Sequence, residues 1–380
     1  MAHLSDRIVV SGYYGFANTG DEAILASLVE HLGRIGELVV LSANPSQTTL
    51  AHGVRAIGRT DVVAISRELS GAALFVSGGG GLLQDTTGLK SVPYYATLLK
   101  AAQWRGVPTM LLGAGVGPLR AVFSRAVAAS AVRHCRVCAV RDDFSADLLR
   151  QLGVSARSLA VTADPALVLS PAPDEALDAK LAAADLDLSI PTIGVAIRPW
   201  PTWYERQFKS FSATLAQVAR SVGAQILVIP FQRPHDERIT QELFDCLQFR
   251  PGDHLPATRL WTQPLAPREM RTLLSRCHLV VGMCLHALIL AAAGAVPFMG
   301  VSYDPKVASF GQRFDMPIAP GVEDLEDTSY LFGVLMQLWE RREDLAERMR
   351  AALPRERELA LRNFELAEDV ARRKGDLQRV

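Results

Sequence analysis

The chain alternates short apolar runs, rich in β-branched residues, with longer stretches of helical periodicity. The apolar runs of the first half are RIVVSG, ELVVLSA, GVRAIG, AALFVSG, PTMLLGAG, RVCAVRD and SLAVTAD, and those of the second half are TIGVAIR, AQILVIP, ATRLWT, HLVVGM and VPFMGV. Strands that alternate with helix-length segments pair in parallel, because each helix carries the chain back over the sheet. The pattern therefore predicts an α/β protein with two similar domains, each built on a parallel sheet.

The length of 380 residues also favours two domains, since a single domain averages roughly 150 residues. The segment 171–190 is acidic, poor in large apolar residues and bounded by prolines, which is typical of a linker. After residue 323 the strand-like runs stop, and apolar residues at helical spacing lie among mixed charges. We expect an N-terminal domain over 1–170, a linker over 171–190, a C-terminal domain over 191–322, and a helical tail over 323–380 that is interrupted at Pro354.

The charge balance excludes several classes of partner. Forty Lys and Arg residues offset forty Asp and Glu residues, so the chain has no strong basic field for nonspecific binding of nucleic acid. With 49% hydrophobic residues it is not a disordered chain. The basic residues of the tail are interleaved with acidic ones, which gives only weak support for contact with an anionic membrane surface.

Cysteines and histidines give no metal-site pattern. The cysteines are five in number and not spaced as a disulfide framework, and the C-x-x-C of Cys135 and Cys138 lies in an apolar run with no second pair. We expect buried thiols, no metal and a reducing compartment.

The start of the chain lacks a signal-peptide pattern. The apolar segment Leu279 to Val301 is cut by Gly294 and Pro297, so we interpret it as strand, helix and strand within a cytoplasmic protein.

The loop after the first predicted strand is a candidate ligand site, because ligands of open parallel sheets bind beyond the carboxyl ends of the strands. It reads YYGFANTGDEA and carries Tyr14, Asn18, Asp21 and Glu22, with a helix expected to begin near Asp21. Amides at that helix start are suited to an anion. The alternative is that Asp21 only caps the helix and the glycines only shape a turn.

A run of four glycines, including Gly79 and Gly80, follows the strand AALFV. Glycines at such a place allow the close approach of a ligand or of neighbouring backbone. The spacing does not match the dinucleotide-binding fingerprint, which disfavours a dehydrogenase. A tight packing corner between strand and helix is the alternative.

The second half offers three candidates at the ends of its strands. Arg198 ends TIGVAIR beside two tryptophans, and its guanidinium suits a carboxylate or phosphate. His286 lies near the start of the helix after HLVVGM, where the helix dipole favours the neutral imidazole and acid–base work. Lys306 follows the next strand and is a candidate phosphate-binding cation. The alternatives are an arginine paired with a carboxylate, a core histidine and a solvated lysine.

Several motifs, in this order, resemble those of the polysaccharide pyruvyl transferase family. They are GYYGFANTGDEAIL, VSGGGGLLQD, LGAGVGP, VRDDFSADLLRQLG, TADPAL, GVAIRPW, GMCLHALILAAAGAVP and VSYDPKV, which together run from Gly12 to Val307. The sequence is most similar to the bacterial members that modify cell-wall polysaccharide for anchoring surface-layer (S-layer) proteins. The resemblance implies a fold of two Rossmann-like domains, called GT-B, with the active site between them.

The resemblance also implies a reaction. The pyruvyl unit of phosphoenolpyruvate would be transferred to two hydroxyls of an N-acetylmannosamine residue as a 4,6-ketal, with release of phosphate. The acceptor would be a polyprenyl-diphosphate-linked disaccharide at the cytoplasmic face of the membrane, in cell wall biogenesis. Phosphoenolpyruvate would act as co-substrate, with no further cofactor.

Residue roles carry over by motif. His286 matches the family's functional histidine and is the candidate general acid that protonates the enol carbon. Because the implied donor carries a carboxylate and a phosphate, we expect Arg198 and Lys306, with the amides of Gly79 and Gly80, to bind it. The candidate acceptor-binding residues are Tyr14, Asn18, Asp21 and Glu22, with Asp164 as a further carboxylate that could orient or deprotonate a sugar hydroxyl.

The chain departs from the family pattern at Cys284, where members usually carry arginine two residues before the histidine. Arg198, Arg141 or Arg233 would then substitute for it, unless donor affinity is reduced or the substrate differs. Two other functions therefore stay open: a nucleotide-sugar glycosyltransferase or epimerase of the same fold, and a non-catalytic glycan-binding relative.

Overall fold

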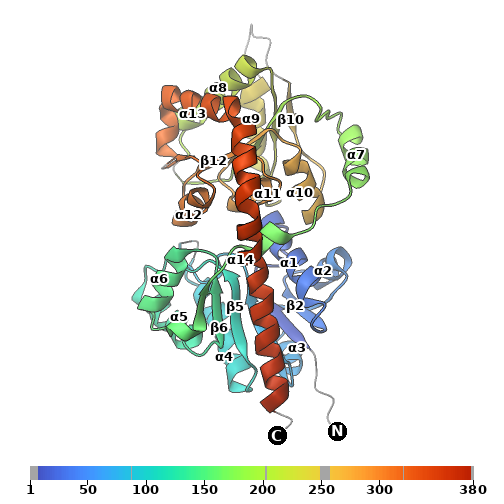
Figure 1. The fold of residues 1–380 in the computed structure, drawn as a ribbon, viewed down its shortest axis with the longest axis vertical. Coiled ribbons are helices and arrows are strands. Elements are labelled where there is room, and N and C mark those ends of the chain that lie inside the picture. Colours follow the sequence, from blue (N-terminus) through green and yellow to red (C-terminus); the bar gives the residue numbers. More distant parts are fainter. Residues whose placement is uncertain (1–6, 87, 202, 249–256, 320, 378–380) are drawn as a thin grey trace. The chain divides into compact units, whose positions relative to one another are not determined.

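The chain forms two compact units. The computed structural model describes residues 7–377 apart from 87, 202, 249–256 and 320. The first unit comprises residues 1–169 and 355–380, and the second comprises residues 170–354 (Figure 1). Each unit is built on one parallel sheet, so the α/β class expected from the alternating runs is confirmed.

The first unit has a seven-stranded sheet in its described residues. In spatial order the strands are β3 (Arg55–Gly58), β2 (Leu38–Ser42), β1 (Ile8–Ser11), β4 (Leu74–Gly78), β5 (Thr109–Ala114), β6 (Val137–Val140) and β7 (Leu159–Val161). The helices are α1 (Thr19–Leu32), α2 (Pro45–His52), α3 (Val62–Leu69), α4 (Ser91–Trp104), α5 (Val122–Val132) and α6 (Asp143–Gln151), with 3₁₀ turns η1 (Ala156–Ser158) and η2 (Pro165–Val168). The order reverses between β1 and β4, and this is the switch point where ligands of such sheets bind.

Apolar strands covered on both faces form the core of this unit. Every residue of β1, β2, β4 and β5 is buried. Val9, Phe75 and Leu111 of three neighbouring strands pack with Leu99 of α4 and Val132 of α5 in one cluster. Continuous rather than alternating apolar runs are what a parallel sheet between two helix layers requires.

The second unit repeats this plan with a six-stranded sheet in its described residues. Its strands are, in spatial order, β10 (Thr258–Leu260), β9 (Gln225–Val228), β8 (Thr192–Ala196), β11 (Leu279–Gly282), β12 (Phe298–Val301) and β13 (Ile318–Ala319). Its helices are α7 (Asp174–Ala183), α8 (Glu205–Val222), α9 (Glu237–Gln248), α10 (Pro267–Ser275), α11 (Leu285–Ala293), α12 (Pro305–Arg313) and α13 (Thr328–Glu340), with the 3₁₀ turn η3 (Glu323–Glu326). The switch point lies between β8 and β11.

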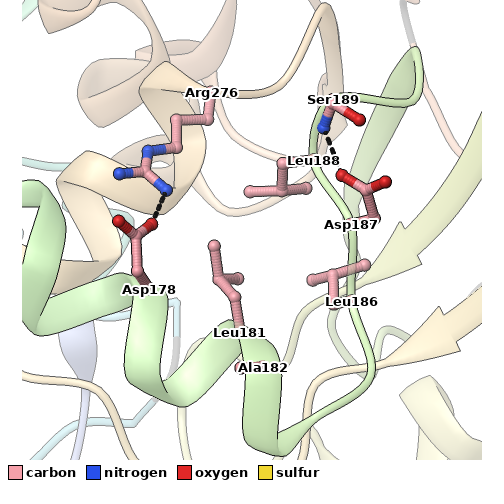
Figure 2. Close-up of a pocket in the computed structure, with 8 residues that line it drawn as sticks. All are labelled: Asp178, Leu181, Ala182, Leu186, Asp187, Leu188, Ser189 and Arg276. Carbon is pink, nitrogen blue, oxygen red and sulfur yellow. Dashed lines mark hydrogen bonds and ion pairs between the residues drawn. The ribbon is translucent and has the colours of Figure 1, made fainter.

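The segment expected as a linker, 171–190, is folded into the second unit. It contains α7, whose Leu177 and Leu181 are buried. Arg276 pairs with Asp174 and Asp178 of this helix, each at 2.5 Å, and Figure 2 shows the pair with Asp178. Two leucines four residues apart and two paired carboxylates are enough to dock a short helix that composition alone describes as polar.

The helical tail is shared between the units. Helix α14 (Arg342–Leu377) continues through Pro354, where the sequence predicted an interruption, and the boundary between the units falls directly after this proline. A proline removes one N–H from the helix ladder. Buried Leu353 in the second unit and buried Ala360 and Phe364 in the first anchor the helix on both sides of it. Figure 1 shows α14 as a single long red helix.

The apolar segment Leu279 to Val301 forms β11, α11 and β12, as predicted. Its strand residues are all buried, and so is α11 except for His286. In the described part of the chain, no helix combines the length and the apolar character needed to cross a bilayer.

Candidate functional sites at the carboxyl ends of the two sheets

The loop after β1 and the first turn of α1 lie at the switch point of the first sheet. The side chain of Asn18 is the N-cap of α1 and accepts hydrogen bonds from the N–H groups of Gly20 at 3.0 Å and Asp21 at 3.4 Å. The helix thus begins at Thr19, and Asn18 rather than Asp21 caps it. Asp21 is buried under the glycine loop that follows β4.

Tyr14 belongs to the core of this loop. Its side chain is buried, and its hydroxyl donates to the carbonyl of Gly78 at 2.8 Å. Burial, together with the carboxylates of Asp21 and Glu22, raises the pKa of this hydroxyl well above its ordinary value. The structure therefore ties the loop after β1 to the end of β4 through Tyr14, whose neutral ring is enclosed by protein.

Glu22 holds the other side of the loop. Its Oε1 accepts from the N–H of Gly15 at 2.8 Å, and its Oε2 lies 2.8 Å from Nε2 of His52 at the end of α2. Gly15 has φ +79°, and a Cβ there would lie 2.2 Å from Oγ of Ser42. The conformation of the loop is thus fixed by a glycine and a carboxylate acting together.

An aromatic cluster with an arginine lies beside this loop, and sequence reasoning did not single it out. The rings of Tyr13 and Phe16 stack with centroids 4.1 Å apart. The guanidinium of Arg59 lies 5.0 Å from the Phe16 centroid and 4.2 Å from that of Tyr94, whose hydroxyl donates to the Arg59 carbonyl at 2.8 Å. Flat rings beside a cation are suited to a sugar carrying a negative charge. The position of Arg59 directly after the run RAIG was the available signal.

Gly79 and Gly80 are explained by the packing of α1. Their φ angles are +61° and +69°. A Cβ on Gly79 would lie 2.3 Å from Cγ2 of Ile24, and one on Gly80 would lie 2.7 Å from Oδ1 of Asp21. The close approach inferred from the glycines is therefore an approach of helix to strand, which was the alternative to donor binding.

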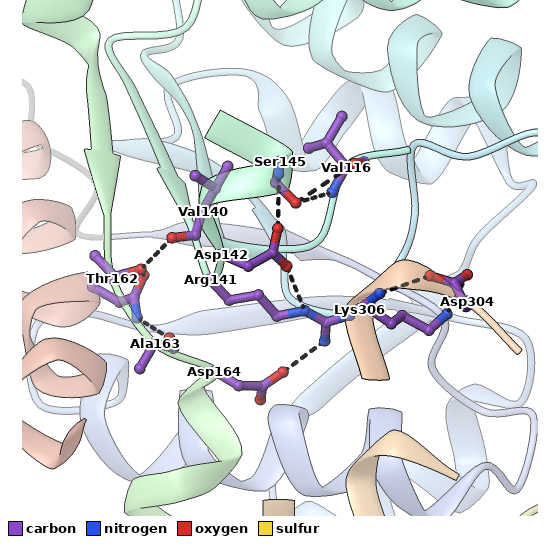
Figure 3. A network of polar contacts seen from close by, with 11 residues as sticks. Val116, Val140, Arg141, Asp142, Ser145, Thr162, Ala163, Asp164, Asp304 and Lys306 are labelled. Carbon is purple, nitrogen blue, oxygen red and sulfur yellow. Dashed lines mark hydrogen bonds and ion pairs between the residues drawn. The ribbon is translucent and has the colours of Figure 1, made fainter. Parts of the chain in front are cut away.

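A buried ion pair lies at the ends of β6 and β7 (Figure 3). Arg141 Nη1 lies 2.7 Å from Oδ2 of Asp164, and Nε lies 3.8 Å from Oδ2 of Asp142. All three side chains are at most 7% exposed. A Cβ on Gly115 would lie 2.7 Å from Nη2 of Arg141, so the glycine after β5 makes room for the guanidinium. The guanidinium of Arg141 at this end of the sheet is therefore already paired with a carboxylate of the protein, that of Asp164.

The second sheet carries Arg198, Lys306 and Tyr303 at the carboxyl ends of its strands. Arg198 follows β8, and its guanidinium lies 5.5 Å from the centroid of the Tyr303 ring. Lys306 Nζ lies 5.4 Å from the same centroid. Trp200 packs against Tyr303 with centroids 4.8 Å apart. Both cations therefore lie beside the same tyrosine ring.

Arg198 is available for an anion. Its Nε is buried, with no hydrogen-bond partner among the described residues. Burial acts to lower its pKa, but Tyr303, Cys284 and Asp236 act more strongly together and raise it, so the side chain stays charged. A buried guanidinium N–H normally has an acceptor, and a bound carboxylate or phosphate would supply one.

Lys306 begins α12 beside the residue that caps this helix. Asp304 accepts from the Lys306 N–H at 3.1 Å and lies 3.2 Å from Nζ of the same lysine (Figure 3). The lysine side chain is 26% exposed. It is therefore a half-buried cation at the end of a strand, whereas the alternative was a solvated surface lysine.

Cys284 and His286 lie at the start of α11, directly after β11. Cys284 is the N-cap residue of this helix, and His286 is half-buried in its first turn. Burial, with a contribution from Asp236, raises the pKa of the Cys284 thiol, while Arg198 and Lys306 act in the opposite direction. The two cations are thus within electrostatic reach of position 284, where the family usually has arginine.

The five cysteines are free thiols. Cys135 and Cys138 are buried thiols, as expected from their apolar run. Among the residues that the structure describes, no group of three His, Cys, Asp or Glu side chains is arranged to hold a metal ion.

The candidates predicted from the sequence separate into two sets. Tyr14, Asn18, Asp21, Glu22, Gly79 and Gly80 meet at the switch point of the first sheet, and Arg198, His286 and Lys306 follow adjacent strands of the second sheet. The predicted donor-binding set is therefore divided, with its glycines in the first unit and its cations in the second.

Solved structures of nucleotide-sugar enzymes have a similar fold. HepE (Alr3699) of Anabaena in complex with UDP and glucose matches with a TM-score of 0.62 at 11% identity, over 96% of this chain and 99% of that chain. MnaA of S. aureus with UDP gives 0.60 at 11% identity over 90% of each chain. UDP-GlcNAc 2-epimerase of Neisseria meningitidis bound to UDP-GlcNAc gives 0.58 at 12% identity, over 90% of this chain and 93% of that one. These likenesses confirm the GT-B-like fold class with two Rossmann-like domains.

The sequence itself matches one family model. Residues 18–305 match the family described as polysaccharide pyruvyl transferase. The match spans both sheets and includes Arg141, Arg198 and His286, while Lys306 follows directly after its end. The chain therefore belongs to the polysaccharide pyruvyl transferase family.

Proposed function

We propose that this transferase moves the pyruvyl unit of phosphoenolpyruvate onto an N-acetylmannosamine residue of a lipid-linked cell-wall polysaccharide precursor. The product is a 4,6-linked pyruvate ketal, and phosphate is released. The observation that carries the proposal is the cationic edge of the second sheet, where Arg198 and Lys306 flank one tyrosine ring and His286 begins the adjacent helix. The proposal includes a cytoplasmic location and a role in anchoring S-layer proteins.

Two separate cations suit this donor, because phosphoenolpyruvate carries a carboxylate and a phosphate on the same carbon. Arg198 offers a planar fork with a buried Nε that lacks a protein acceptor. Lys306 offers a point charge 5.4 Å from the centroid of the Tyr303 ring, and it is paired with Asp304 at 3.2 Å. We assign the carboxylate to the arginine and the phosphate to the lysine.

Arg198 is the best-supported substitute for the arginine that position 284 lacks. Arg233 donates to the Trp261 carbonyl at 2.8 Å and pairs with Glu237 at 3.0 Å, so its donors are engaged. Arg141 is matched by Asp164. Arg198 alone of the three candidates influences the Cys284 thiol electrostatically. The positive charge that the family places at 284 is therefore supplied from the neighbouring strand.

The histidine supplies the proton. Protonation of the terminal enol carbon by His286 leaves the adjacent carbon electrophilic, and a sugar hydroxyl adds there with loss of its own proton. The second hydroxyl then attacks the same carbon, the bond from that carbon to the phosphate oxygen breaks, and the ring closes. The phosphate leaves with the bonding electron pair, and Arg198 and Lys306 stabilise the developing charge.

The first unit supplies the acceptor side in this proposal. Asn18, Asp21 and Glu22 surround the loop after β1 and are supported by Tyr14 from within. The stacked pair Tyr13 and Phe16, with Arg59, gives a flat surface beside it, shown by centroid distances of 4.1 and 5.0 Å. Rings of this kind bind the apolar faces of sugars.

The direct test is phosphate release from phosphoenolpyruvate with a lipid-linked or synthetic N-acetylmannosaminyl-N-acetylglucosamine acceptor. We expect release that depends on the acceptor, with a product heavier by one pyruvate less one water. His286→Ala should lose at least about 100-fold in kcat, since a general acid contributes roughly 10²–10⁴-fold. His134→Ala, at an exposed histidine, is the matched control. Absence of release with every acceptor would refute the reaction.

A nucleotide-sugar reaction is the second candidate, because the solved structures of similar fold contain UDP or UDP-GlcNAc. The cations Arg198 and Lys306 would suit a diphosphate equally well. The same assay therefore includes UDP-GlcNAc in place of phosphoenolpyruvate. Turnover or tight binding of the nucleotide sugar, without reaction of phosphoenolpyruvate, would favour this function. Binding of a glycan without any turnover would favour the non-catalytic relative.

A further inference from the structure

Three large apolar side chains protrude from two neighbouring loops of the first unit. Leu89 is 63% exposed and lies two residues before the start of α4, while Val122 and Phe123 are 83% and 65% exposed in the first turn of α5. We call these three residues the apolar patch. Single exposed apolar residues are common on protein surfaces, but three on adjacent loops need an explanation.

The two loops are held together, so the patch is one surface. Asp85 in the loop before α4 accepts hydrogen bonds from the N–H groups of Arg120 at 2.9 Å and Ala121 at 2.8 Å in the loop before α5. Helices α4 and α5 also pack closely along the sheet. The apolar side chains are therefore presented by a braced pair of helix starts.

Positive charge surrounds the patch. Lys90 and Arg120 are exposed next to Leu89 and Val122, and neither has an ion pair among the described residues. Asp85 is the only acidic residue in 84–90 and 117–125, and three hydrogen bonds from backbone N–H groups occupy its carboxylate. The chain as a whole is neutral, so this local excess of positive charge is a property of the two loops.

We propose that the apolar patch inserts into the interfacial region of a bilayer containing anionic phospholipid. Apolar side chains flanked by unpaired cations match the chemistry of such a surface, with rings and aliphatic groups among the acyl chains and cations at the headgroups. Three side chains of about 150–200 Å² each are too small an area for a stable protein interface, which buries about 800 Å² per partner. The proposal rests on this surface and not on the proposed reaction.

The test measures, by co-sedimentation, how the full chain without substrate binds to vesicles of phosphatidylcholine with and without phosphatidylglycerol. We expect binding that requires phosphatidylglycerol and weakens with added salt. Phe123→Gln should reduce the partition coefficient about tenfold, as loss of a buried large apolar side chain does. Lys90→Gln and Arg120→Gln should each reduce it roughly fivefold.

Trp104→Gln is the matched control. Trp104 is 80% exposed at the far end of α4, about 20 Å from Leu89 along the helix, since each residue adds about 1.5 Å. This variant should bind vesicles as the unchanged protein does. The proposal is overturned if the protein ignores these vesicles, or if Trp104→Gln weakens binding as much as Phe123→Gln. It is also overturned if Phe123→Gln changes the oligomeric state in sedimentation while vesicle binding persists.

Discussion

Replacing Asn363 should lower the denaturant concentration at which the end of the first sheet unfolds. This residue is about 200 positions away in sequence from Thr162 and Ala163, which it contacts directly after β7. Asn363 lies in the part of α14 that belongs to the first unit and is fully buried. Its Nδ2 donates to the Ala163 carbonyl at 2.9 Å, and its Oδ1 accepts from the Thr162 hydroxyl at 2.9 Å. Asp164, the partner of Arg141, follows directly.

The magnitude follows from the contacts that each substitution removes. In Asn363→Leu, which has a similar size, the buried Ala163 carbonyl loses its donor at a cost of about 1–3 kcal/mol. The Thr162 hydroxyl loses a bond that contributes about 1 kcal/mol, although it can still donate to the Val140 carbonyl at 3.1 Å. We expect a loss of about 2–4 kcal/mol in the free energy of unfolding.

Asn363→Asp separates hydrogen bonding from packing. Aspartate has nearly the same shape, but it would place a second acceptor against the Ala163 carbonyl and bury a charge, so it should destabilise more than leucine does at neutral pH. Burial would raise the pKa of this carboxyl above its unfolded value. The lost stability should therefore return as the pH falls, because the protonated carboxyl can donate again.

The assay is urea unfolding followed by circular dichroism, with hydrogen–deuterium exchange of peptides covering 159–169 as the local measurement. Arg362→Leu is the matched control, because Arg362 is the neighbouring residue and makes only an exposed pair with Glu365. It should change the free energy of unfolding by less than about 0.5 kcal/mol. The reasoning fails if Asn363→Leu is equally harmless, or if Asn363→Asp is no worse than Asn363→Leu at neutral pH.

Two further predictions concern glycine and cysteine. Gly80→Ala should lower the urea midpoint more than Gly53→Ala: both glycines have φ near +65 to +69°, but only at Gly80 would a Cβ meet Asp21 Oδ1 at 2.7 Å. The difference should be about 1–3 kcal/mol, and equal effects would contradict the packing explanation of the loop. Burial raises the pKa of the Cys277 thiol from its ordinary value of 9.0 to about 12. The stability that the neutral thiol gives is therefore fully present below pH 9.0 and is lost as the pH rises from there to about 12. Cys277→Ala should make alkaline unfolding less steep, and an unchanged pH dependence would exclude this thiol as a cause.

The sheets could be predicted because their signal is local. Apolar runs such as AALFV form the buried strands, and the strands occur where the alternation placed them except for β13, whose two residues lie outside the predicted runs. The helix α7 was missed because its docking depends on Arg276, almost 100 residues later. The composition of a segment depends only on its own residues, whereas the ion pairs of α7 also need Arg276 from another segment of the second unit.

The candidate sites divide in the same way. Arg198 and His286 could be singled out because each directly follows a strand, and strand ends of a parallel sheet share one edge. Arg59 also follows a strand, but its significance lies in Phe16, from the loop after β1, and Tyr94, from α4, which both approach it. The sequence of the glycine run left two explanations open, a bound ligand or a close approach of the protein itself. The freedom of φ at these glycines was real, but the group that approaches Gly79 is Ile24 of the protein itself.

Position 284 bears on the charge that the proposed reaction would need. A buried thiol whose pKa is raised is neutral at physiological pH, so cysteine there removes a full positive charge relative to arginine. A dianionic or trianionic donor would then bind weakly unless another cation acts at the same place. Arg198 stays charged, has a buried Nε without a protein acceptor, and lies within electrostatic reach of the thiol. In the proposed reaction, Arg198 at the end of β8, the strand that pairs directly with β11, would therefore take the place of the arginine that position 284 lacks.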